Sequence, residues 1–140
     1  MELLNDYTTA LWGLWILAVT LMAQGVVAAT AKGSRPGAVP GKIDESLSHD
    51  SFVFRAHRTF MNSLENIPAM LATALIAFFA GANPMWTGVF IWVFALARLA
   101  HMALYYAIAT EKNPSPRSYF FLIGLIANIA LLVVAALGLM

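Results

Sequence analysis

A short run of polar side chains opens the segment FRAHRTFMNSLENIPAMLATALIAFF, whose second half is apolar. The run consists of Arg55, Arg58, Asn62 and Glu65. At about 100° per residue, these four side chains lie within roughly 80° of one helix face. Arginine forks bind carboxylates or phosphates, and a carboxylate among them suits a ligand ammonium group. The run therefore indicates one wall of a site for a zwitterionic ligand with an excess of negative charge.

A second polar stripe consists of Arg98, His101 and Tyr105, which share about 60° of another helix face. The two stripes together hold three arginines against one carboxylate, so pairing within the chain leaves positive charge uncompensated. Ionisable groups within membrane spans are costly and usually face each other or a ligand. In a purely structural alternative, Arg58 pairs with Glu65, while His101 and Tyr105 close a buried hydrogen-bond network.

The composition places both stripes in a membrane protein. Of the 140 residues, 61% are hydrophobic and 11% are charged, whereas soluble domains have roughly 45–50% apolar and 25% charged residues. The net charge of +1 argues against a nucleic-acid partner. The chain has no cysteine, which excludes a thiolate nucleophile and thiolate metal sites, and we predict no metal site.

Four segments are long enough to cross a bilayer, which takes about 20 mostly apolar residues. We expect spans at about 7–31, 52–82, 85–110 and 117–140. The second span reaches full length only if it includes the polar run, and Asn83-Pro84 ends it. The predicted fold class is all-α, a four-helix transmembrane bundle forming a single domain over residues 1–140.

The positive charges predict the orientation of the bundle. They fall on the first loop, residues 32–51, at the start of the second span and beside the third loop: Lys32, Arg35, Lys42, Arg55, Arg58, Lys112 and Arg117. Cytoplasmic loops carry such an excess, so both termini are expected outside the cytoplasm. The first loop is rich in Gly, Pro and Ser and shows no motif.

Three motifs together resemble the MAPEG family, the membrane-associated proteins in eicosanoid and glutathione metabolism. They are Arg58-x-x-x-Asn62-x-x-Glu65-x-x-Pro68, Ala97-Arg98-x-x-His101-x-x-x-Tyr105 and Pro116-Arg117-Ser118. The resemblance covers all four spans. It is closest to bacterial members and to the branch of microsomal prostaglandin E synthase and microsomal glutathione transferase, which implies a bacterial inner-membrane protein.

The resemblance implies a homotrimer that binds glutathione between subunits near the cytoplasmic side. It assigns glutathione binding to Arg55, Arg58, Asn62, Glu65, Arg98, His101 and Tyr105, with Glu65 on the amino group. It implies that Arg117 stabilises the glutathione thiolate with Ser118 beside it, although Lys112 competes for that role. The implied activity is a glutathione transferase or peroxidase acting on hydrophobic electrophiles or lipid peroxides from the bilayer.

Two other functions compete with this one. A non-catalytic, modulatory trimer has counterparts within the same family. A small transporter subunit is less favoured, because ion relays usually place carboxylates near the membrane midplane and the only span carboxylate, Glu65, is near the edge. In the last span, we expect Asn128 to form a helix-packing hydrogen bond.

Overall fold

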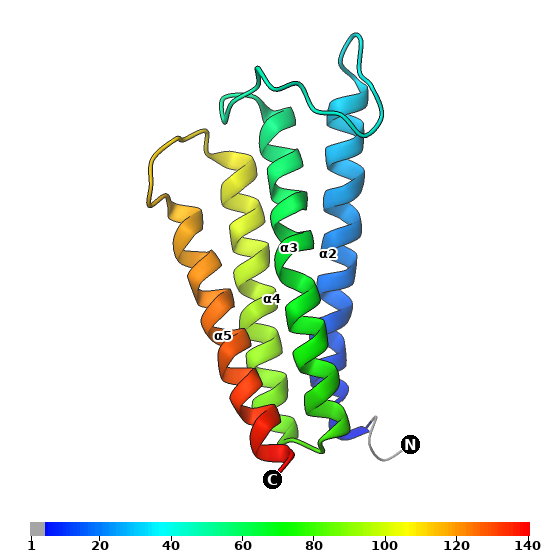
Figure 1. Ribbon diagram of the computed structural model, residues 1–140, viewed down its shortest axis with the longest axis vertical. Helices are drawn as coiled ribbons and strands as arrows, with labels where there is room; N and C mark the ends of the chain where they lie inside the picture. Colours follow the sequence, from blue (N-terminus) through cyan, green and yellow to red (C-terminus); the bar gives the residue numbers. More distant parts are fainter. Residues whose placement is uncertain (1–4) are drawn as a thin grey trace.

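The computed structural model describes residues 5–140, and four long helices make up most of this part of the chain. They are α2 (Thr8–Gly33), α3 (Phe52–Phe79), α4 (Pro84–Ala107) and α5 (Pro116–Gly138). The helices run up and down in chain order, so that α2 begins and α5 ends at the same end of the bundle (Figure 1). This arrangement confirms the predicted all-α four-helix bundle.

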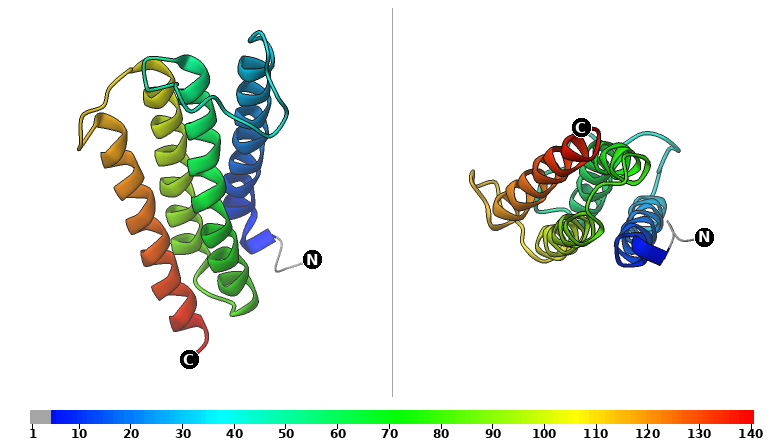
Figure 2. Two further views of the ribbon diagram at one scale, coloured as in Figure 1. Left: turned by 45° about the horizontal axis from the view of Figure 1, so that its top comes forward. Right: turned by 90° about the horizontal axis from the view of Figure 1, so that it is seen from below.

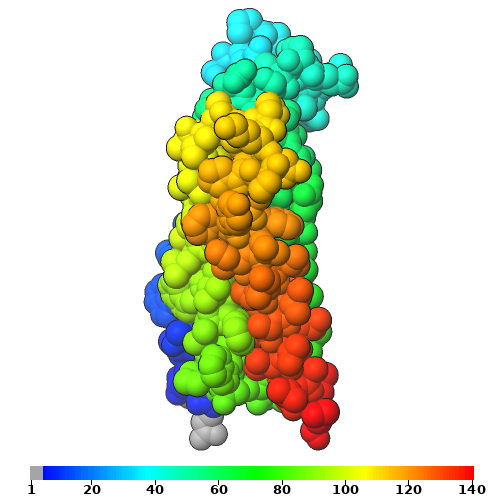
Figure 3. Space-filling view, turned by 90° about the vertical axis from the view of Figure 1, so that its left-hand side faces the viewer, coloured from blue at the N-terminus to red at the C-terminus, as the bar shows by residue number. Residues whose placement is uncertain are grey.

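The two helices that carry the polar stripes lie at the centre of the bundle. Seen along its axis, α3 and α4 separate α2 from α5 (Figure 2). The first loop and the connection between α4 and α5 lie at the same end of the bundle. Figure 3 shows this end at the top, with α5 on the face toward the viewer. The polar halves of α3 and α4 adjoin this loop end, because α3 starts there and α4 finishes there.

Local sequence signals set the helix ends at the tight second turn. The side chain of Asn83 accepts a hydrogen bond from the Trp86 amide at 3.1 Å, and Pro84 occupies the first helical position of α4. Gly81 has a positive φ of 62°, which suits glycine. The Tyr7 hydroxyl donates to the Ala82 carbonyl, so the start of α2 is tied to this turn.

The outer surface of the bundle is apolar. Large side chains such as Met22, Phe79 and Leu137 are more than 60% exposed, as expected for groups that face lipid. Among the described residues, α2, α4 and α5 are long and apolar enough to cross a membrane. Helix α3 has 28 residues but falls outside this group, because its first half carries the polar stripe.

A close approach between α2 and α4 supplies a stability prediction. A Cβ atom added to Gly13 would lie 2.7 Å from Cγ2 of the fully buried Ile91. We expect Gly13→Ala to destabilise the bundle by about 1–3 kcal/mol, the usual cost of overpacking. Thermal unfolding in detergent measures this. The matched control is Gly33→Ala, where nothing lies within 4 Å, and equal melting of the two variants would contradict the prediction.

Candidate functional site

Arg98 is the most deeply buried charged side chain of the site. It is 1% exposed, and its Nη2 donates to Oδ1 of Asn62 at 2.7 Å and to Oγ of Ser63 at 3.1 Å. These bonds join the two polar stripes across α3 and α4. Both partners are neutral, and within residues 5–140 no carboxylate forms an ion pair with Arg98. Nε of Arg98 is buried without a partner, so this cation still has hydrogen-bonding capacity for an anion.

A second cluster forms where α4 ends and α5 begins. The guanidinium carbon of Arg117 lies 4.1 Å from the ring centroid of Tyr105, a close cation–π contact. Nη2 of Arg117 donates to the Thr110 carbonyl at 3.1 Å, while its Nη1 is buried without a partner. The buried His101 ring lies 5.4 Å from the Tyr105 ring, and its Nδ1 also lacks a partner. The fold thus brings His101, Tyr105 and Arg117 together.

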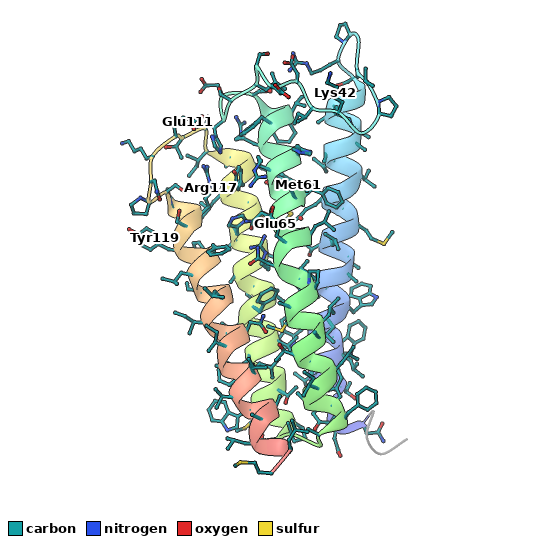
Figure 4. All side chains as sticks on the ribbon, viewed as in Figure 1. Lys42, Met61, Glu65, Glu111, Arg117 and Tyr119 are labelled. Carbon is teal, nitrogen blue, oxygen red and sulfur yellow. The ribbon has the colours of Figure 1, made fainter. Side chains whose placement is uncertain are left out.

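Arg58 and Glu65 lie on the same half of α3 and are not fully buried. Arg58 is half-buried and Glu65 is exposed, and Figure 4 shows Glu65 below the level of Arg117. In the described part of the chain, the ion pairs are Arg35–Asp44 and His49–Glu111 only. Arg58 therefore does not pair with Glu65, and the structural alternative for these two residues is wrong within one chain. Both side chains remain available to a ligand or to a neighbouring subunit.

Arg55 makes contacts of a different kind. Its Nη1 donates to the carbonyls of His49 at 2.6 Å and Asp50 at 2.9 Å, and its Nη2 donates to the Tyr106 carbonyl at 3.4 Å. All three acceptors belong to the backbone. Arg55 thereby ties the start of α3 to the first loop and to the end of α4, at the edge of the site.

Ser118 is held in a helix cap. Its hydroxyl accepts from the Ser115 amide at 3.1 Å and lies 3.1 Å from the Ser115 hydroxyl, and together they form a capping box at the start of α5. The cap defines the start of α5, in which Arg117 is the second residue. Lys112, the competitor of Arg117, is exposed in the connection before α5.

One expected polar contact is absent. The amide oxygen of Asn128 is buried in α5 and has no hydrogen-bond partner within residues 5–140. The predicted packing bond is therefore wrong within the described single chain.

The sequence model of the MAPEG family matches residues 9–137, which covers nearly the whole chain. The chain belongs to the MAPEG family. No curated protein and no solved structure gives a significant match. Membership makes this chain a membrane protein of glutathione or eicosanoid metabolism, in a family that includes glutathione transferases as well as members without catalysis.

This MAPEG chain also has site residues that the sequence did not reveal. Ser63, next to Asn62, is fully buried against Arg98. His49 and Glu111 come from the first loop and from the connection before α5, and they pair at 2.8 Å beside Tyr105. The backbone amide and the ring of His49 both donate to Glu111, and this lowers the pKa of that carboxyl. No local motif links two residues 62 positions apart.

Proposed function

We propose that this chain is an integral membrane glutathione-dependent transferase or peroxidase. Its second substrate would be a hydrophobic electrophile or a lipid peroxide that enters from the bilayer. The observation that carries the proposal is the buried, uncompensated guanidinium of Arg98, which has only neutral partners in the described chain. A buried cation of this kind is costly unless an anion accompanies it.

The residues present fit glutathione. This tripeptide has two carboxylates, one ammonium group and one thiol, and its net charge complements the excess of arginine on the stripes. Four buried nitrogens of the site lack partners in the described chain: Nε of Arg55, Nε of Arg98, Nη1 of Arg117 and Nδ1 of His101. The three arginine nitrogens are donors only, so they need acceptors of the kind that carboxylates or a thiolate supply.

We assign the parts as follows. Arg58, Asn62 and Glu65 hold the tripeptide from α3, with Glu65 on its amino group. Arg98, His101 and Tyr105 line the same pocket from α4. Arg55 supports this pocket from its edge through its backbone contacts.

Arg117 would stabilise the thiolate. A thiol with a pKa of about 8.5 is only a few per cent ionised at pH 7, and a neighbouring cation lowers that pKa. An arginine keeps its proton in proteins, so Arg117 acts as an electrostatic stabiliser rather than as a base. Ser118 holds the start of α5 and thereby the place of Arg117. Arg117 is favoured over Lys112 because it is half-buried against Tyr105, whereas Lys112 is exposed.

The proposal includes a homotrimer in which glutathione lies between neighbouring subunits. The exposure of Glu65 supports the trimer, because an exposed carboxylate in a span otherwise faces lipid. Residues 1–140 would form one membrane domain of the bacterial inner membrane, with loop 32–51 in the cytoplasm and both termini outside. The charges of the loop end support this orientation.

A non-catalytic trimer is the second candidate. It is favoured by the contacts that Arg98 and Arg117 already make within the chain, since these contacts tie α4 to α3 and the start of α5 to the connection before it. In that case the polar stripes stabilise the bundle and glutathione is absent or structural.

Glutathione binding to the detergent-purified protein separates the two candidates. We expect calorimetry to show binding that Arg58→Ala and Glu65→Gln each weaken at least tenfold, or by about 1.4 kcal/mol. Arg35→Ala is the matched control, because it removes the same charge from an exposed ion pair in the first loop. A wild-type protein that binds no glutathione would overturn the proposed activity in its glutathione form.

A further inference from the structure

His49 is held on one side by a single carboxylate. Its backbone amide donates to Oε1 of Glu111 at 3.0 Å, and its ring Nδ1 lies 2.8 Å from Oε2 of the same group. The first loop is thereby joined to the connection between α4 and α5. Glu111 is itself exposed, but the His49 side chain is only 18% exposed, so the ring is fixed within the protein.

The other side of the His49 ring meets a proposed ligand-binding residue. Nε2 of His49 lies 3.0 Å from the hydroxyl oxygen of Tyr105, and the two rings stack at 5.7 Å between centroids. Phe54 packs edge-on against the His49 ring at 4.9 Å. The backbone is also held, because Arg55 donates to the His49 carbonyl at 2.6 Å. The orientation of the ring is therefore determined from several sides.

The hydrogen bonds from Glu111 through His49 to Tyr105 determine which group accepts the hydroxyl hydrogen of Tyr105. An ionised Glu111 only accepts, so Nδ1 of His49 must carry a hydrogen. In the neutral ring Nε2 is then an acceptor, and the Tyr105 hydroxyl donates to it. The lone pairs of the Tyr105 oxygen are left for the pocket. When His49 is protonated, its Nε2 donates instead, and the Tyr105 hydroxyl can give its proton to a ligand.

We propose that His49, anchored by Glu111, is a positioning residue that decides whether the Tyr105 hydroxyl accepts or donates a hydrogen bond in the pocket. The identity of the ligand rests on the proposed function. Four other groups lie against His49 or Tyr105: Phe54 and Arg55 from α3, His101 from α4, and Arg117 from α5 on the face of the Tyr105 ring. The Arg117 cation favours the state in which the Tyr105 hydroxyl donates to His49, because the Tyr105 oxygen is more negative in that state. The lone pairs of this oxygen then face a donor in the pocket.

The first test needs no ligand. Nitrogen NMR of histidine-labelled protein in detergent, recorded over a pH series, reports which ring nitrogen carries the hydrogen, and loss of one signal in His49→Phe assigns it among the three histidines. For the neutral ring we expect hydrogen on Nδ1 and a bare Nε2, and we expect Tyr105→Phe to shift the Nε2 resonance. Hydrogen on Nε2 only, or an Nε2 resonance that Tyr105→Phe leaves unmoved, would overturn the proposal.

The second test follows the thiol of bound glutathione through the ultraviolet absorbance of its thiolate. His49→Phe keeps an aromatic ring against Tyr105 but removes both nitrogens. We expect the thiolate fraction at neutral pH to change about threefold, or half a pKa unit, while the dissociation constant changes less. His57→Phe is the matched control, because His57 makes no hydrogen bond within residues 5–140.

The results of these two tests distinguish a failure of the positioning role of His49 from a failure of the proposed glutathione-dependent function. Equal behaviour of His49→Phe and His57→Phe would overturn the positioning role. A loss of affinity and of folding in His49→Phe, with no separate change in the thiolate fraction, would overturn it as well, because that result describes a structural residue. A wild-type protein that binds no glutathione overturns the proposed function, and the NMR measurement then decides the role of His49 toward Tyr105 by itself.

Discussion

Arg98→Met is expected to weaken glutathione binding by about 100-fold, or about 2.8 kcal/mol, with little change in the stability of the ligand-free protein. The binding loss follows because, in the proposed complex, a charge-assisted contact between the guanidinium and a glutathione carboxylate disappears. The stability of the ligand-free chain has two opposing contributions. Removing an uncompensated buried charge is favourable, whereas Asn62 and Ser63 lose their donor at a cost of about 1–3 kcal/mol.

Thermal unfolding with and without glutathione measures both effects at once. A ligand that binds the folded state raises the melting temperature, so glutathione should stabilise the wild type and have little effect on Arg98→Met. Arg98→Lys is the control, because it keeps the charge but loses the planar fork, and we expect intermediate affinity. If Arg98→Met melted far below the wild type and still bound glutathione normally, Arg98 would be a structural residue that holds α3 to α4.

Arg117→Ala is expected to remove the thiolate of bound glutathione at neutral pH while leaving its dissociation constant nearly unchanged. Without the cation, the thiol returns toward its ordinary pKa of about 8.5, and the ionised fraction at pH 7 falls to a few per cent. The rate with a hydrophobic electrophile should fall by about tenfold or more at pH 7. It should recover as the pH rises through the ordinary pKa of the thiol, because the thiolate then forms without help.

A pH–rate profile combined with thiolate absorbance tests this role. Lys112→Ala is the control, since Lys112 is a cation of the same connection that stays exposed. Arg117→Lys keeps the charge but weakens the stacking on Tyr105, so a partial loss is expected. If affinity and thiolate fell together in Arg117→Ala, Arg117 would bind the tripeptide rather than its thiol. A shift in Lys112→Ala alone would move the role to Lys112.

Much of this protein follows from local sequence signals. The lengths of the apolar segments and the Asn83-Pro84 break predict the four helices, because helix formation in lipid depends on composition and on the positions of proline. The spacing of Asn62 and Arg98 predicts that each faces inward from its own helix. The 3.6-residue period of a helix is a property of one segment, so a single sequence is enough to read it.

Only the tertiary structure decided which of these side chains meet. Arg98 bonds to Asn62 and Ser63, while Glu65 lies exposed without an ion pair in the described chain, and no spacing rule distinguishes the two outcomes. His49 and Glu111 meet beside Tyr105 although one of them lies in a loop without any motif. Contacts between distant segments depend on how α3, α4 and α5 pack and on where the loops cross their ends. That packing is a property of the whole chain, because each helix takes its place only against the others.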